Sequence, residues 1–272
     1  MTESRILLPV ESALHSLWRR RGALVSAVLE NACYDGIVRK THTKGVNTMK
    51  KRIRLADRVL PDYSRGEERV NMITHIVGGG LGVMALFLCV ARAAINGSSW
   101  GAWTAVVYGI CMITLYTMSS VYHGLRDGMA KRVMQVLDHC TIYCLIAGTY
   151  TPVVLTAIRP VYPVLGWGLF FFEWGLAALA ITLTAIDLKK YNAFSMICYI
   201  GMGWAIIPFA GIIIELMGME GFGLLLAGGI SFTVGAILYG IGTRKKWMHS
   251  VFHIFTVLGT TLQFFAIYLY VM

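Results

Sequence analysis

Two histidines, His249 and His253, lie four residues apart in the apolar segment WMHSVFHIF. On an α-helix this spacing places both side chains on one face, with His253 about 6 Å farther along the axis than His249. Imidazole nitrogens are common metal ligands, and three of them form a familiar set for Zn²⁺ that leaves a fourth position for water. The pair therefore raises the question of a third ligand.

His123, in the segment SSVYHGL, is the candidate third ligand, and Asp138, in LDHCTIY, supplies a carboxylate. Zn²⁺ would lower the pKa of a bound water toward 7 and so provide a nucleophile at neutral pH. A carboxylate such as Asp138 could hold or deprotonate that water. Ser119 precedes His123 by four residues and shares its helical face. These residues together could form a zinc site with an activated water.

Each of these residues also has an ordinary interpretation. A single histidine near a helix end is more often an interfacial residue than a ligand, and a pair of histidines is compatible with contact to lipid headgroups. Cys140 and Cys144 form a second pair with a spacing of four, but they lie on the helical face opposite Asp138. We interpret these cysteines as small packing residues, and His139 as a neighbour outside the site.

The composition indicates where such a site would lie. Of the 272 residues 57% are hydrophobic and only 14% are charged, whereas a soluble domain carries about a quarter charged residues. Residues 1–69 hold more than half of the lysines and arginines and form a basic arm, which precedes a membrane domain at 70–272. The basic residues flank apolar segments, which favours anionic lipid headgroups over nucleic acid as partners. Met49 can serve as a start, so residues 1–48 are assigned no function.

A helix needs about 20 apolar residues to cross a bilayer. Seven apolar runs have this length, at 70–94, 100–122, 137–158, 163–186, 192–214, 221–241 and 249–271. The links after the second, fourth and sixth runs are rich in lysine and arginine, which places these links and the basic arm in the cytoplasm. We therefore expect an all-α integral membrane protein of the cell membrane, a seven-helix bundle with its N-terminus cytoplasmic and its C-terminus outside.

This topology gathers the polar residues of four runs in one leaflet. His249 and His253 begin the seventh run, His123 ends the second and Asp138 begins the third. A further stripe at the start of the first run consists of Glu68, Asn71 and His75. Because the topology was derived from lysines and arginines alone, the agreement is independent support for a site in the inner leaflet.

Three other features of the runs predict local structure. Glu173 lies near the middle of the fourth run, where we expect it to be buried and largely neutral. Pro152 and Pro208 should kink the third and fifth runs. The glycines of VGGGLGV in the first run favour close contact with a neighbouring helix.

The quoted segments resemble those of a known family. EERVNMITH, SSVYHGL, LDHCTIYCLIAGTYTP and HSVFH occur in this order, and the chain resembles the hemolysin III family, bacterial relatives of the progestin and adipoQ receptor (PAQR) family. The resemblance implies seven helices with a cytoplasmic N-terminus and a zinc site at His123, His249 and His253. It also implies contact between Asp138 and the water on the zinc, and it matches Ser119 to the serine of a Ser-x-x-x-His motif.

Three functions follow as hypotheses. The first is a zinc hydrolase that acts on a lipid amide or ester in the inner leaflet, because the wider superfamily includes alkaline ceramidases; Asp138 would move the proton and Ser119 would contribute a hydrogen bond. The second is a sensor or regulator of membrane lipid state that keeps zinc for structure. The third, suggested by the family name, is a cytolysin that lyses foreign cells, although no ring of charged residues marks an ion path.

Overall fold

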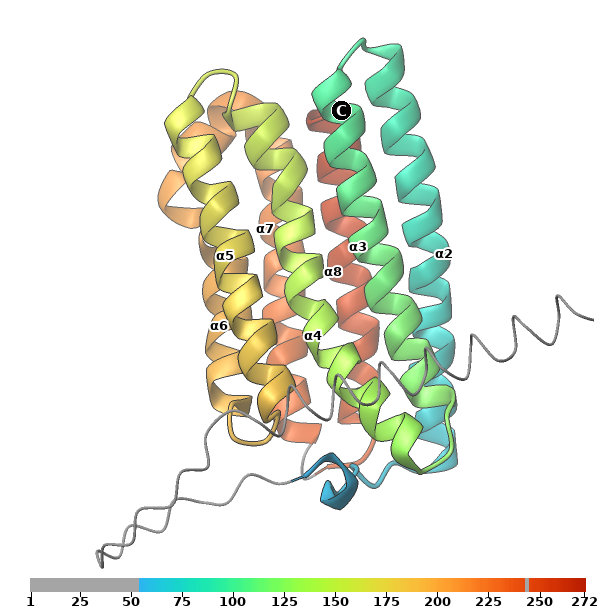
Figure 1. The fold of residues 1–272 in the computed structure, drawn as a ribbon. Helices are drawn as coiled ribbons and strands as arrows, with labels where there is room; N and C mark the ends of the chain where they lie inside the picture. Colours follow the sequence, from blue (N-terminus) through green and yellow to red (C-terminus); the bar gives the residue numbers. More distant parts are fainter. Residues whose placement is uncertain (1–53, 243–244) are drawn as a thin grey trace, which may run out of the picture. The chain divides into compact units, whose positions relative to one another are not determined.

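Long apolar helices make up most of the structure, a computed structural model in which residues 54–242 and 245–272 are described. They contain no β-strand, in agreement with the expected all-α class. The helices, drawn in Figure 1, are α2 (Arg65–Ile95), α3 (Ser99–Gly124), α4 (Met129–Pro152), α5 (Pro163–Ile186), α6 (Asn192–Trp204), α7 (Ala210–Gly242) and α8 (Met248–Tyr270). The predictions for residues 1–53, including most of the basic arm and the start at Met49, lie outside the described residues.

Six helical segments of the described chain are long and apolar enough to cross a membrane, one fewer than the seven runs expected. The difference lies in the fifth and sixth runs, 192–214 and 221–241, which fall inside a single continuous segment, Asn192–Gly242. Within it, α6 passes through a short 3₁₀ turn, Ile207–Phe209, into α7, and the expected link at 215–220, which contains Glu215 and Glu220, is part of α7. The backbone inside α7 departs from helical geometry at Gly218, where φ is 73° and ψ is 169°, a conformation that favours glycine.

The two prolines mark departures from α-helical geometry, as expected. Pro152 ends α4, which continues as a π-helical turn at Val153–Ile158. Pro208 lies in the 3₁₀ turn that separates α6 from α7. Both interruptions follow from proline's missing N–H group and from its clash with the preceding turn.

Close approaches between helices bring α8 next to the N-terminal helices. A Cβ added to Gly78 would lie 2.5 Å from the ring of Tyr116, and one added to Gly82 would lie 3.1 Å from the backbone of Ile113, so α2 and α3 are in contact through glycine as predicted. The hydroxyl groups of Tyr116 and Thr260 share a hydrogen bond of 2.7 Å between α3 and α8. Helix α8 also packs against α2 and α7 (Figure 1).

The starts of α2 and α8 are joined by one carboxylate. Glu67 forms a capping box with Ser64, and its Oε1 also accepts a hydrogen bond of 2.6 Å from the backbone N–H of Trp247. Trp247 precedes α8 in a left-handed conformation, with φ at 67°, and its ring lies over Gly66. This link sets the start of α8, and therefore His249 two residues later, against the start of α2.

Glu173 is fully buried on α5, as expected for a residue near the middle of a span. Both of its carboxylate oxygens lack a hydrogen-bond partner among the described residues. Its predicted neutral state stays a prediction.

Candidate metal centre

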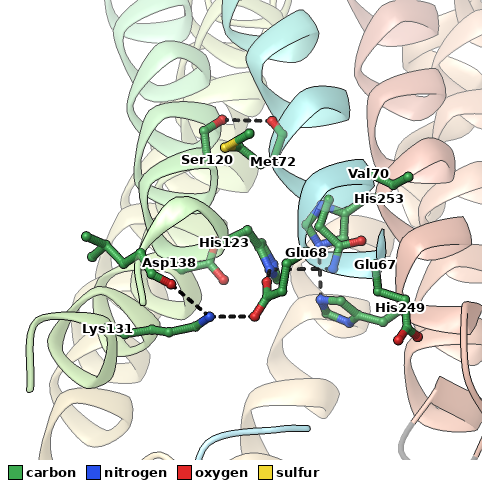
Figure 2. A network of polar contacts seen from close by, with 12 residues as sticks. Glu67, Glu68, Val70, Met72, Ser120, His123, Lys131, Asp138, His249 and His253 are labelled. Carbon is green, nitrogen blue, oxygen red and sulfur yellow. Dashed lines mark hydrogen bonds and ion pairs between the residues drawn. The ribbon is translucent and has the colours of Figure 1, made fainter. Parts of the chain in front are cut away.

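Three histidines from two helices converge as the sequence predicts. His123, at the end of α3, meets His249 and His253, on the first two turns of α8, and one ligand nitrogen from each lies within 4.8 Å of the others. All three side chains are buried, and the Nε2 atoms of His249 and His253 are 3.0 Å apart (Figure 2). Within the described residues this is the only cluster of histidine, cysteine, aspartate or glutamate with metal-binding geometry.

The donor set fits a zinc ion. Four-coordinate Zn²⁺ with bonds of 2.0–2.1 Å holds its ligand nitrogens about 3.4 Å apart, so small side-chain rotations suffice for the three imidazoles to reach one ion. Nε2 of His123 and Nδ1 of His253 are buried without a hydrogen-bond partner in the described chain. A cation would satisfy the orphaned nitrogen of His123, and at the Nε2 atoms of His249 and His253 it would replace the contact between them.

Glu68 is a residue of the site that the sequence reasoning left without a role. Its carboxylate lies between Nδ1 of His123 and Nζ of Lys131, each at 2.5 Å (Figure 2). Lys131 is itself buried and also donates to the carbonyl of Leu125. A carboxylate on the second nitrogen of a metal-binding histidine usually selects its tautomer and holds the ring in place. The position of Glu68 at the start of the first span, in line with Asn71, is the sequence feature that could have indicated this role.

Asp138 and Ser119 reach the same cavity as the histidines. Both line a cavity of about 150 Å³ together with His249 and His253. The hydroxyl of Ser119 is buried without a partner in the described chain, and the carboxylate of Asp138 lies 3.7 Å from Nδ1 of His139. Neither forms a hydrogen bond or ion pair with the three histidines among the described residues, so their catalytic roles stay predictions. His139 also lines this cavity, closer to the site than the sequence suggested.

Two further aromatic residues enclose the cluster. His75 packs its ring 3.9 Å from the ring of His253, and both of its nitrogens lack partners in the described chain. Tyr63, just before α2, stacks on His249 with ring centroids 4.7 Å apart. Burial raises the pKa of the Tyr63 hydroxyl far above its usual range, and nearby Tyr239 and Glu68 raise it further. Tyr63 is therefore a neutral phenol that covers the cluster on one side.

The cavity is long and mainly apolar. Along α8 it is lined from His249 to Gln263, a distance of about 21 Å at 1.5 Å per residue. Its wall away from the histidines includes Ile142, Ile146 and Phe232. Such a shape suits an acyl chain whose polar end lies at the histidines.

The rival cysteine pair lies elsewhere. Sγ of Cys140 points to the carbonyl of Ile181 on α5, at 3.8 Å, and neither Cys140 nor Cys144 belongs to the metal cluster. Their interpretation as packing residues agrees with this position.

The region of the chain that carries the site is similar to known proteins. The family described as Haemolysin-III related matches residues 63–264. Hemolysin-3 of Bacillus cereus is 36% identical over 206 residues, which cover 76% of this chain and 92% of that protein. The Hemolysin-3 homolog of Bacillus subtilis (strain 168) is 34% identical over 204 residues, 75% of this chain and 94% of that protein.

More distant similarity extends to animals. The human protein named monocyte to macrophage differentiation factor is 24% identical over 212 residues, 75% of this chain and 84% of that protein. No solved structure matches the chain significantly. With six helical segments suited to crossing a membrane and a family match over most of its length, the chain is a multi-pass cell-membrane protein that belongs to the haemolysin-III related family.

Proposed function

We propose that this protein is a zinc-dependent hydrolase that cleaves an amide or ester bond of a membrane lipid in the inner leaflet. The observation that carries the proposal is the convergence of three buried histidines at one end of a long apolar cavity. The histidines provide a ligand set with a free position, and the cavity provides a place for an acyl chain beside it.

In this proposal each residue has a defined task. His123, His249 and His253 hold the ion, and Zn²⁺, when bound, supplies a Lewis acid that polarises a carbonyl group and acidifies water. Asp138 accepts a proton from the attacking water and returns it to the leaving amine or alcohol. Water oxygen bonds to the carbonyl carbon, the C–N or C–O bond breaks, and a fatty acid is released. Ser119 donates a hydrogen bond beside the reacting carbonyl.

The proposed topology has seven crossings, with the N-terminus in the cytoplasm and the C-terminus outside. The segment Asn192–Gly242 has 51 residues, about 77 Å of straight helix, against a hydrocarbon core of about 30 Å. The hydrogen bond of 3.0 Å from Trp204 Nε1 to Thr233 Oγ1 joins α6 to the second half of α7, which supports two antiparallel crossings on either side of Gly218. The positive residues of the links support the orientation.

A lipid sensor that keeps zinc for structure is the second candidate. It is favoured by Tyr63, which stacks on His249 and covers one side of the cluster, because a structural zinc site is closed to exchange. The cytolysin hypothesis is third and relies on the names of the Bacillus relatives alone.

The test is metal analysis of the detergent-purified protein beside release of fatty acid from ceramide-type amides and from ester lipids. We expect about one zinc per chain and release from at least one lipid class. The variant His253→Ala should lose most of the zinc and the activity, and Asp138→Asn should keep much of the zinc and lose the activity. Equal zinc in wild type and in a His123/His249/His253 triple alanine variant refutes the metal site. Unchanged hydrolysis in Asp138→Asn refutes Asp138 as the base, and zinc in the wild type without hydrolysis of either lipid class favours the sensor.

A further inference from the structure

A second pocket, of about 790 Å³, opens beside the metal centre where α2 begins. Four basic side chains from α2, from the link between α3 and α4, and from α4 line it; we call this the basic pocket, and these residues are Arg65, Arg69, Arg126 and Lys131. Unlike the apolar cavity, the basic pocket is lined mainly by polar and charged side chains.

The charges of the basic pocket are not balanced from within. Lys131 is bonded to Glu68 and lies 3.7 Å from Asp127, the two acids of the pocket. The three arginines form no ion pair with any other residue in the described part of the chain. Three guanidinium groups on one pocket wall therefore have no carboxylate partner, and arginine's planar fork is suited to phosphate oxygens.

The metal centre lies between the basic pocket and the apolar cavity. His123 lines the basic pocket, whereas His249 and His253 line the apolar cavity. Their ligand nitrogens lie within 4.8 Å of one another. A molecule with an apolar chain in the cavity and an anionic group in the pocket would therefore place its middle at the histidines.

We infer that the basic pocket binds the phosphate of an anionic membrane phospholipid whose acyl chain enters the apolar cavity. Basic pockets at the membrane surface attract anionic headgroups, and Arg65, Arg69 and Arg126 supply the charge here. The inference deepens the proposed function, on which it rests for the reaction, because it names the substrate class as an anionic phospholipid. Tyr63, which lines the basic pocket and stacks on His249, lies at the junction of the two parts.

The test compares lipid binding by three full-length variants with that of the wild type. In the first, Arg65, Arg69 and Arg126 are all replaced by glutamine; in the second, all three are replaced by lysine, which keeps the charge. The matched control replaces three basic residues outside the pocket with glutamine: Lys189, Lys190 and Lys245. Native mass spectrometry of the purified proteins counts bound phosphatidylglycerol against phosphatidylcholine with the same acyl chains, and circular dichroism checks that each variant is folded.

We expect the wild type to bind phosphatidylglycerol more tightly than phosphatidylcholine. The arginine-to-glutamine variant should bind phosphatidylglycerol about tenfold more weakly or worse, since each basic group near an anionic surface contributes substantially to binding. The lysine variant and the control should keep most of it. An equal loss in the control would assign the preference to general surface charge and overturn the inference. Equal binding of the two lipids by the wild type would overturn it as well.

Two further readouts separate the source of the phosphate and the reaction. If soluble glycerol 3-phosphate displaces phosphatidylglycerol completely at millimolar concentration, the ligand is the free phosphate compound and the lipid assignment fails. Binding requires no turnover, so phosphatidylglycerol bound through the arginines without hydrolysis of any lipid would refute the hydrolase and support this inference. Hydrolysis of a neutral lipid amide without arginine-dependent binding of phosphatidylglycerol would support the hydrolase and refute this inference.

Discussion

At the residue scale, Glu68 contacts both His123 of the candidate metal centre and Lys131. Its contact with Nδ1 of His123 leaves Nε2 as the nitrogen of that ring without a hydrogen-bond partner among the described residues. Its second contact, to buried Lys131, supplies a positive charge that stabilises this partly buried carboxylate. The structure therefore assigns Glu68 a positioning role that acts through His123.

We expect Glu68→Gln to weaken zinc affinity about 10- to 100-fold, the usual effect of losing a partner of a metal-binding histidine. The amide keeps the shape of the side chain and loses the charge, so Lys131 is left without its closest anion. Competition with a zinc-binding dye measures the affinity directly. Glu220→Gln is the control, since Glu220 accepts a hydrogen bond from Tyr270 at the opposite end of α8 and has no ion pair among the described residues. Equal affinity in the two variants would show that Glu68 does not position His123.

At the scale of elements, glycine sets the distance between α2 and α3. Gly78 faces the ring of Tyr116, which packs edge-on against His75 and bonds to Thr260. Gly80, two residues later, has nothing within 4 Å of an added Cβ. The two positions are therefore a matched pair on one helix.

We expect Gly78→Ala to destabilise the protein, by about 1–3 kcal/mol as for other overpacked positions, and to weaken zinc binding through Tyr116 and His75. Gly80→Ala should leave stability unchanged or raise it slightly, because alanine is the better helix former. Thermal unfolding in detergent, followed by circular dichroism, compares them. Equal melting temperatures would contradict the close contact between α2 and α3.

A second prediction at this scale concerns the link between α2 and α8. Glu67→Ala removes both the capping box with Ser64 and the acceptor for the Trp247 N–H group, whereas Ser64→Ala removes only the capping interaction. A lost cap costs about 1 kcal/mol, and loss of the partly buried hydrogen bond from Trp247 costs about 0.5–1.5 kcal/mol more. We therefore expect the lower melting temperature, and weaker zinc binding, in Glu67→Ala. If the two variants have the same melting temperature, the hydrogen bond to Trp247 contributes nothing to stability.

At the scale of the whole molecule, the distribution of charge predicts the orientation. Lys189 and Lys190 follow α5. Arg126 lies in the link between α3 and α4, and Lys131 and Arg132 lie on the first turn of α4. Both sets belong on the cytoplasmic side by the positive-inside rule.

A single cysteine placed near Lys190, in a variant without the native cysteines, should resist a membrane-impermeant maleimide added to intact cells. A cysteine added after Met272 should react with it. Labelling near Lys190 from outside would invert the topology and would place the metal centre in the outer leaflet.

Local features of the sequence were sufficient for most of the helices and for the three histidines that converge. Apolar length predicts a membrane helix because the bilayer core sets it, and a spacing of four predicts that His249 and His253 share a face because helical geometry is regular. His123 could be added because the charges of the links indicate which helix ends meet in one leaflet. None of these inferences needs the packing of side chains.

Packing alone decided the surroundings of the histidines and the count of helical segments. Glu68 contacts residues 55 and 63 positions away in the chain, and no local pattern indicates which partner a buried carboxylate will find. Tyr63 and His75 reach His249 and His253 only because α2 packs against α8. Likewise, the expected link between the fifth and sixth runs, residues 215–220, lies inside the single segment Asn192–Gly242, where the backbone departs from helical geometry at Gly218. The hydropathy pattern did not indicate that α7 continues through Glu215 and Glu220.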